Sequence, residues 1–284
     1  MDPPNCFSWN TIIRALSESD DQNDDDPFQA LVLFRLMLVD ELVEPNRFTF
    51  PSVLKACAKT GRVEEGKQVH GMVVKIGLED DEFVPSNLVR MYVMCGAMEY
   101  AHVLFNSNKV NVERKTQMGG TVLWNVMVDG FNGLFKEAIE LFRDMQMGDT
   151  RPNYVTLVSV LPAISRLGAL ELGKWVHLYA ERNGIGIDEV LGSALIDMYS
   201  KCGSIDKVLQ LFESLSQKNV ITWNAILGGL AMHNRGKDAV DFFSKMQQVG
   251  VGPSEVTYIS VLTACSHAGL VQEVVNPFSI TWLK

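Results

Sequence analysis

Residues 189–219 read EVLGSALIDMYSKCGSIDKVLQLFESLSQKN, a stretch with two apolar stripes separated by Gly203. Each stripe follows the spacing of one face of an α-helix. Glycine adopts, at little cost, the left-handed backbone conformation that ends many helices. The stretch therefore predicts a hairpin of two helices with its turn at Gly203.

The same hairpin pattern recurs along the chain in three types of unit, always in the same order. The first type contains SWNTII (8–13), LWNVMV (123–128) and TWNAIL (222–227); the second contains FPSVLKAC (50–57), LVSVLPAI (157–164) and YISVLTAC (258–265); the third contains LVRMYVMCG (88–96) and LIDMYSKCG (195–203). A residue that tolerates the left-handed turn is fifteenth in six units: Gly61, Gly96, Gly168, Gly203, Asn234 and Gly269. Hairpins repeating at this period predict an all-α fold, an α-solenoid.

The composition narrows the class of protein. The 284 residues are 47% apolar and 21% charged, which suffices for a core and argues against a disordered chain. The net charge of −9 argues against a generic polyanion binder, which depends on clustered Lys and Arg. No apolar run reaches the roughly 18–20 residues that span a bilayer. The five cysteines form no C-x-x-C motif, so we expect reduced thiols and no metal site. We also expect no cofactor, no membrane segment and no small-molecule substrate.

These units resemble the repeats of plant pentatricopeptide repeat (PPR) proteins, in particular the PLS subclass, in which P, L and S repeats alternate. The resemblance implies a single right-handed α-solenoid of stacked helix-turn-helix repeats over residues 1–284. The predicted P units are 6–46, 121–153 and 220–254, the L units are 47–81 and 154–188 with a partial L unit at 255–284, and the S units are 82–120 and 189–219.

Four segments depart from the family pattern. An acidic insertion at 19–26 reads as a solvated, disordered loop, and the S unit at 82–120 is too long, with a loose stretch from 106 to 120. The second P unit is short near 131–134, and the chain leaves the L pattern after Glu273. We therefore expect a fragment or truncated member of a longer protein, without the C-terminal E/DYW extension of many relatives.

The resemblance implies where RNA is read, because the fifth and last residues of a PPR repeat read one base. The implied base-reading residues are Asn10, Asn46, Ser86, Asn125, Asn153, Ser193, Asn219, Asn224 and Ser254. By the same analogy the first two P units prefer pyrimidines, the third prefers cytosine, Ser86 suggests a purine and Ser193 suggests adenine. The implied RNA core is Y-n-R-Y-n-A-C.

Other positions imply supporting roles. Apolar second residues are implied to wedge between bases: Phe7, Phe48, Phe83, Val122, Val155, Val190, Ile221 and Val256. Three thirteenth residues are weaker candidates for phosphate contacts: Lys59, Arg166 and Lys201. The L units carry Pro51, Val158 and Ile259 at the fifth position. Apolar groups cannot hydrogen-bond a base edge, so the L units should mainly hold spacing.

Each candidate also has a purely structural interpretation. Asn and Ser at the fifth position could cap or solvate a helix start, and the cations near helix ends could complement the helix dipole. Trp9, Trp124 and Trp223 could stack on bases, but aromatic residues at helical spacing are more often core. His70 and His177 occupy equivalent positions without a nucleophile motif, so we expect packing and no catalytic residue.

The leading hypothesis is sequence-selective binding of single-stranded RNA in a mitochondrion or chloroplast, for C-to-U editing or another RNA-processing step. Zinc-dependent cytidine deamination needs H-x-E and C-x-x-C motifs, and the sequence contains neither. The chain is therefore expected not to be an enzyme, and any chemistry would come from a missing C-terminal domain or from a trans-acting deaminase or editing-factor protein. Two alternatives stay open: a protein-binding scaffold like tetratricopeptide arrays, which the net charge favours, and a truncated remnant without activity, which the irregular units favour.

Overall fold

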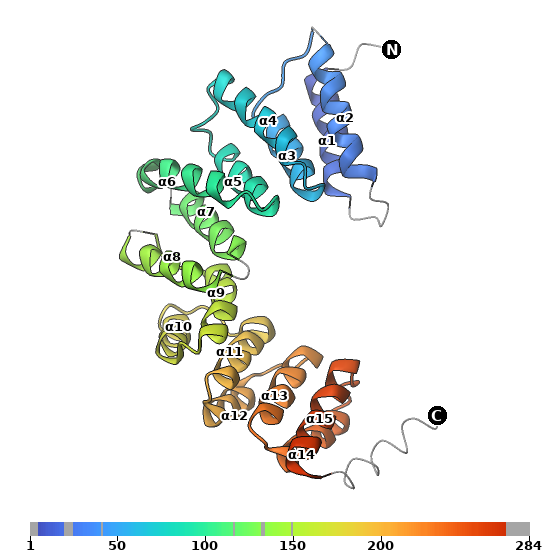
Figure 1. Cartoon of the computed structure of the whole chain (residues 1–284), viewed down its shortest axis with the longest axis vertical. Helices are drawn as coiled ribbons and strands as arrows, with labels where there is room; N and C mark the ends of the chain where they lie inside the picture. The colour runs from blue at the N-terminus through green and yellow to red at the C-terminus, as the bar shows by residue number, and fades with distance from the viewer. Residues whose placement is uncertain are drawn as a thin grey trace. The chain divides into compact units, whose positions relative to one another are not determined.

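The computed structural model describes residues 5–19, 25–40, 42–115, 117–131, 134–148 and 150–270. In these residues the chain forms fifteen α-helices and no strand (Figure 1). In chain order they are α1 (Cys6–Glu18), α2 (Asp25–Val39), α3 (Thr49–Lys59), α4 (Val63–Ile76), α5 (Val84–Met94), α6 (Met98–Lys115), α7 (Gln117–Gly130), α8 (Phe135–Met147), α9 (Tyr154–Leu167), α10 (Leu170–Arg182), α11 (Glu189–Lys201), α12 (Ile205–Ser214), α13 (Val220–Met232), α14 (Gly236–Gln248) and α15 (Glu255–Ala268). The all-α prediction is confirmed.

The helices belong to two compact units. Residues 1–132 with 141–151 form the first, and residues 133–140 with 152–284 form the second. In the first unit, α1, α3, α5 and α7 pack in series, and α2, α4 and α6 each pack between two of them. In the second unit, α9, α11, α13 and α15 form the series, with α10, α12 and α14 behind. Each unit is thus a two-layer stack of helical hairpins, as the repeats predicted.

The predicted turns are confirmed at all six positions. Gly61, Gly96, Gly168, Gly203 and Gly269 have φ between 64° and 79°, and Asn234 has a φ of 55°. The backbone at Gly203 shows why the residue type matters: its N–H bonds to Ser200 O, and the next N–H reaches Tyr199 O, so the turn closes the end of α11. A side chain with a Cβ is strained in this conformation.

The four segments that depart from the family pattern are described to different extents. The expected loose stretch at 106–120 is wrong, because α6 continues to Lys115 and α7 begins at Gln117, before the predicted start of the P unit at 121. Residues 106–115 contain neither glycine nor proline, so nothing local ends the helix there. Most of the acidic insertion, the shortened turn near 131–134 and the tail after 270 lie outside the described residues.

Trp124 and Trp223 confirm the core prediction, since they are only 2% and 3% exposed. Trp124 packs edge-on against Phe105, and Trp223 packs the same way against Phe212, with ring centroids 4.8 and 4.7 Å apart. Trp9 is half-buried. The two buried tryptophans, Trp124 and Trp223, therefore join hairpins and do not face a ligand.

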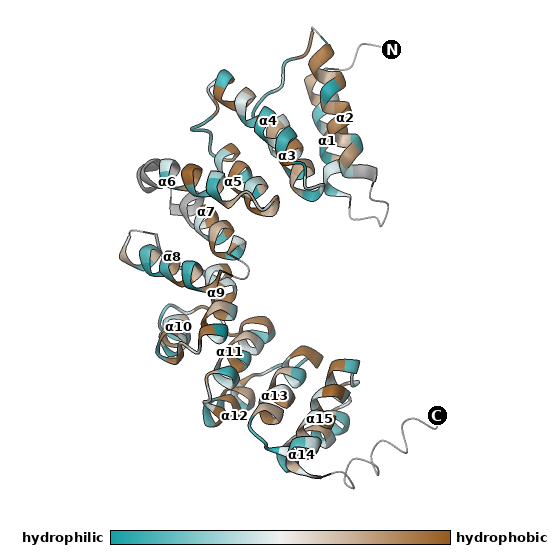
Figure 2. Cartoon of the chain, viewed as in Figure 1, coloured by the Kyte–Doolittle hydropathy of each residue, from teal (hydrophilic) through white to brown (hydrophobic). Residues whose placement is uncertain are grey.

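Most helices carry both hydrophilic and hydrophobic residues along their length (Figure 2).

One contact recurs at the junction between each complete predicted L unit and the predicted S unit that follows it. His70 Nδ1 lies 3.0 Å from the hydroxyl of Tyr92, and His177 Nδ1 lies 3.0 Å from the hydroxyl of Tyr199. Burial lowers the pKa of both histidines and raises the pKa of both tyrosines. The geometry accounts for the two histidines as packing residues between neighbouring hairpins.

Candidate nucleic-acid interface

The last residue of a unit sits at the start of the next first helix, and its side chain accepts backbone N–H groups there. Asn219 Oδ1 accepts from Ile221 and Thr222, and Asn153 Oδ1 accepts from Thr156 at 3.1 Å. The remaining last residues that cap in this way are Asn46, Asp81, Asp188 and Ser254. These bonds satisfy donors that the first helical turn leaves free. The last residue of one unit therefore caps the first helix of the next unit, whose own fifth residue lies about one turn inside that helix.

In two P units the fifth and last side chains meet, although more than 29 residues separate them in the chain. Asn10 Nδ2 donates to Asn46 Oδ1 at 3.3 Å. Asn224 Nδ2 donates to Ser254 Oγ at 3.0 Å, and Asn224 Oδ1 accepts from Thr257 Oγ1 at 2.6 Å. Thr49 plays the part of Thr257 in the first unit, donating to Asn10 Oδ1 at 2.7 Å. The threonine of the next helix therefore orients the fifth-position amide.

The serines at the fifth position are held differently. Ser193 is 6% exposed, and its Oγ bonds to Glu189 O at 2.5 Å and lies 3.0 Å from Thr222 Oγ1. Thr222 in turn donates to Asn219 Oδ1 at 3.2 Å, so one hydroxyl links the predicted pair. Ser86 Oγ donates to Phe83 O within its own helix.

The predicted pair of the remaining P unit, Asn125 and Asn153, is divided between the two compact units. Asn125 is buried in α7 of the first, and Asn153 is exposed just before α9 in the second.

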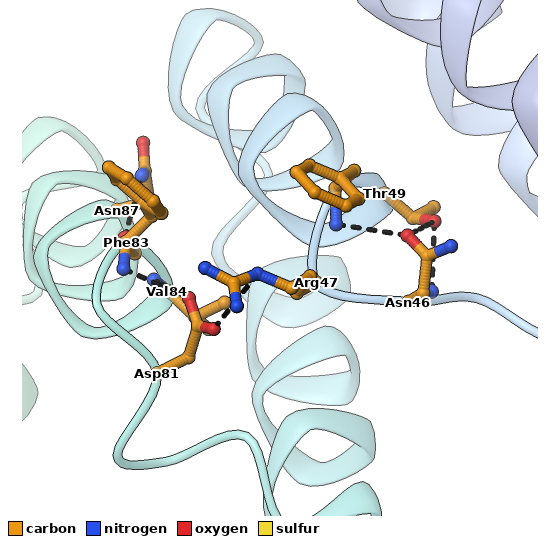
Figure 3. Close-up of polar contacts among 8 residues, drawn as sticks. Asn46, Arg47, Thr49, Asp81, Phe83, Val84 and Asn87 are labelled. Atoms are coloured by element: carbon orange, nitrogen blue, oxygen red, sulfur yellow. Dashed lines mark hydrogen bonds and ion pairs between the residues drawn. The ribbon is translucent and has the colours of Figure 1, made fainter.

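In both complete predicted L units, the first residue of the unit contacts its last residue. Arg47 Nε forms an ion pair with Asp81 Oδ2 at 3.3 Å, as Figure 3 shows. The Tyr154 hydroxyl donates to the Asp188 carboxylate, 2.9 Å from each oxygen. Burial and this bond raise the pKa of Tyr154 to about 12. The pKa of Asp188 is lowered, because bonds from Leu191 N–H and Tyr154 outweigh its desolvation.

All eight predicted wedge residues are exposed, in contrast to the apolar residues of the core. Their exposed fractions run from 45% at Val122 to 78% at Phe7. Seven of them lie in or beside the first turn of a first helix, and Val122 lies in the second turn of α7. Within each compact unit, these apolar side chains recur at one fixed offset of successive first helices and form contact points that the core does not use.

A groove of about 870 Å³ lies in the first unit, lined by residues of α1, α3 and α5. Phe7, Phe48 and Phe83 all line it, together with Asn10. The guanidinium of Arg47 lies 5.5 Å from the ring centroid of Phe48 and 5.9 Å from that of Phe83. Figure 3 shows Arg47 at the base of α3 reaching toward Asp81, with Phe83 at the start of the next first helix.

The groove is basic. Its lining contains five cations, Arg14, Arg47, Lys55, Lys59 and Arg90, and the single carboxylate among its lining residues is that of Glu18. Four of these cations, all except Lys59, are not among the residues predicted from the sequence, because they do not occupy the thirteenth position of a unit. Three of them, Arg14, Lys55 and Arg90, occupy the same position of their predicted units, and this shared position is the sequence signal that could have found them.

The predicted phosphate contacts differ in their surroundings. Lys59 lines the groove and donates to Ser19 O at 3.0 Å. Lys201 pairs with Asp197 at 2.7 Å. Arg166 is exposed in the last turn of α9. All three lie at helix C-termini, where a cation also complements the helix dipole.

The thiols belong to the packing. Cys57 and Cys265 are buried, and burial raises the pKa of Cys57 to about 12. Within the described ranges, no three His, Cys, Asp or Glu side chains gather in a way that could hold a metal ion. No helix in the described part of the chain is both long and apolar enough to cross a membrane.

Comparison with known proteins places these features in a family. The profile of the PPR repeat family matches residues 218–267, and that of the PPR repeat matches 48–78, 122–148 and 193–220. The pentatricopeptide repeat-containing protein At5g48910 of Arabidopsis thaliana is 56% identical over 318 residues, covering 98% of this chain and 49% of that protein. At1g59720 of the same plant, named chloroplastic/mitochondrial, is 36% identical, covering 94% and 41%. The chain therefore spans about half or less of the length of these relatives.

Solved structures show the same fold. The crystal structure of the pentatricopeptide repeat protein PPR10 from maize matches with a TM-score of 0.72 at 18% identity, covering 98% of this chain and 38% of that one. PPR10 in complex with an 18-nt psaJ RNA element matches with a TM-score of 0.78 at 19% identity, covering 99% and 41%. With its repeated hairpins, its matched repeat profiles and its close relative in a plant, the chain belongs to the pentatricopeptide repeat family.

Proposed function

We propose that this chain binds single-stranded RNA along the first turns of its first helices and selects bases through the fifth and last residues of its P and S units. The observation that carries the proposal is the contact between fifth and last side chains, Asn10 with Asn46 and Asn224 with Ser254, beside exposed apolar second residues. PPR10, which shares the fold, is described in complex with RNA.

The proposed division of labour follows from chemistry. Exposed Phe, Val and Ile side chains tolerate any base, so contact with them supplies affinity and not selectivity. Asn10 Nδ2 donates to Asn46 Oδ1 and weakly to Cys6 Sγ, and Asn10 Oδ1 accepts from Thr49, so a second lone pair of this oxygen remains for a base. A threonine that holds the amide in place reduces the ordering cost when a base binds.

We propose that the L units contribute little base selection and mainly maintain the spacing between the units that select bases. Their fifth residues, Pro51 and Val158, are apolar, and their last-position carboxylates are already occupied. Asp81 pairs with Arg47 and Asp188 accepts from Tyr154, while both also cap the next helix. A carboxylate with its lone pairs engaged in this way offers little to a base edge.

The biological role is proposed as recognition of an organellar RNA site for C-to-U editing or another processing step, with any chemistry supplied by a deaminase or editing-factor protein in trans. The PLS assignment and the unit boundaries are part of this proposal. The organelle is supported by the relative named chloroplastic/mitochondrial.

The test is binding of the purified chain to a short RNA carrying Y-n-R-Y-n-A-C, against a permuted RNA of equal composition. Ser193→Asn should weaken the adenine preference at one position, while Ser216→Asn, in an exposed loop outside a reading position, should not. Equal binding of both RNAs would reduce the proposal to backbone binding. A folded chain that binds neither RNA would favour the protein-scaffold alternative.

A further inference from the structure

The ninth residue of each unit changes character along the chain. Counted from the predicted unit starts at 6, 47 and 82, it is Arg14, Lys55 and Arg90. In the five following units it is Asp129, Pro162, Asp197, Gly228 and Thr263. A cation therefore recurs at one offset in the first three units and at none of the later ones.

The structure brings these three cations to one place. They lie on α1, α3 and α5, which pack in series, and all three line the 870 Å³ groove. Each also lies seven residues after an exposed phenylalanine in or just before its own helix: Phe7 and Arg14, Phe48 and Lys55, Phe83 and Arg90. Seven residues are about two helical turns, so each aromatic–cation pair shares a helix face, roughly 10 Å apart along the axis.

The cations are available to a ligand. All three side chains are exposed, and neither Lys55 nor Arg90 forms an ion pair with any residue in the described part of the chain. Arg14 pairs with Glu18 at 3.2 Å, but the two side chains are 70% and 46% exposed. An ion pair so open to water contributes little and yields readily to a competing anion.

The sign of the local charge selects the class of ligand. The chain carries a net charge of −9, yet five cations and one carboxylate line this groove, and the excess of positive charge remains after the pairing of Arg47 with Asp81. A concave basic surface concentrates field and attracts polyanions. The alternation of cation and exposed aromatic ring, one of each per helix, suits a polymer that repeats phosphate and base, since bases stack on aromatic side chains.

We propose, resting on the RNA-binding function above, that this groove is the main attachment site for the RNA backbone, with Arg14, Lys55 and Arg90 contacting one phosphate each. The second compact unit then contributes base selection with little backbone charge, because its ninth residues are neutral or acidic. The carboxylate of Asp197, for example, forms an ion pair with Lys201. RNA should engage the α1–α3–α5 groove even when the bases facing the later units do not match.

The test compares the salt dependence of RNA affinity between the full chain and the triple variant Arg14→Gln, Lys55→Gln, Arg90→Gln. For single strands, each phosphate contact contributes about 0.7 to the slope of log affinity against log salt. The triple variant should therefore lose about 2 from the slope and on the order of 100-fold in affinity at 0.1 M salt. Selectivity between Y-n-R-Y-n-A-C and its permutation should be retained at low salt.

A matched control removes the same charge elsewhere. Lys75, Arg182 and Lys207 are exposed cations of α4, α10 and α12, in the layer behind the first helices. Their triple Gln variant should keep the slope to within one phosphate contact, and circular dichroism should show both triples folded. Excess polyglutamate should not displace the RNA from the full chain.

The outcomes separate the two proposals. If the unaltered chain binds no RNA at any salt concentration, the proposed function itself is wrong. If it binds RNA but the groove variant keeps its slope, or the control variant loses as much, the groove assignment is wrong. Displacement by polyglutamate would also overturn it, in favour of an acidic protein ligand.

Discussion

Two glycines of α4 make the packing of the hairpins testable. A Cβ added to Gly66 would lie 2.6 Å from Met91 Cε and closer still to its Sδ, whereas a Cβ on Gly71 would meet nothing within 4 Å. Met91 is on the neighbouring α5 and is fully buried. Both glycines lie inside the same helix, so Gly→Ala brings about the same gain in helix propensity at each, up to about 1 kcal/mol.

We predict that Gly71→Ala stabilises the chain by about 0.5–1 kcal/mol and that Gly66→Ala destabilises it relative to Gly71→Ala by about 1–3 kcal/mol. The propensity gain cancels in the comparison, which leaves the steric cost of moving Met91. The assay is urea unfolding followed by circular dichroism, comparing midpoints at constant slope. Adding Met91→Ala should make Gly66→Ala much less harmful, because the space is then open.

The reasoning would be refuted if Gly66→Ala were as stabilising as Gly71→Ala, or if Met91→Ala did not change its effect. The second L unit offers an independent repetition, since a Cβ on Gly173 would collide with Met198 in the same way.

Three further predictions concern the caps, the L-unit contact and the histidines. Asn219→Ala should cost about 1 kcal/mol of stability through loss of a helix cap, whereas Asn224→Ala should alter base selectivity with less effect on unfolding; equal unfolding midpoints for the two would contradict the assignment. Tyr154→Phe should raise the pKa of Asp188 in an NMR titration, so the stability that this carboxylate contributes above its unfolded pKa becomes smaller, and its loss on acidification is complete at a higher pH; an unchanged pKa would show that Tyr154 does not act on it. Burial lowers the pKa of His177 from 6.5, so the unfolded chain binds the proton more readily and stability should fall as pH drops below about 6.5; His177→Gln should flatten that part of the stability–pH curve.

The turns and the core were predictable because their causes are local. A helix that must end in the left-handed region needs glycine or asparagine at that residue, so Gly203 and Asn234 are recognisable without knowing any neighbour. Trp124 and Trp223 recur at fixed helical spacing, and that period places them on a buried face. The end of helix α6 differs from the prediction. The irregular repeat length predicted a loose stretch from residue 106, whereas the helix continues to Lys115, because residues 106–115 contain no helix-breaking residue.

The hairpin, its period, its turns and the offsets of the candidate reading residues follow from the sequence alone, because helical periodicity and backbone conformation depend on residues a few positions apart. Only the tertiary structure decided which of those side chains meet. The bond from Asn10 to Asn46 and the ion pair from Arg47 to Asp81 join residues 36 and 34 positions apart, and their geometry depends on how one hairpin stacks on the next. The same stacking collects Arg14, Lys55 and Arg90 into one basic groove of an acidic chain, since a solenoid places equal offsets of successive helices side by side.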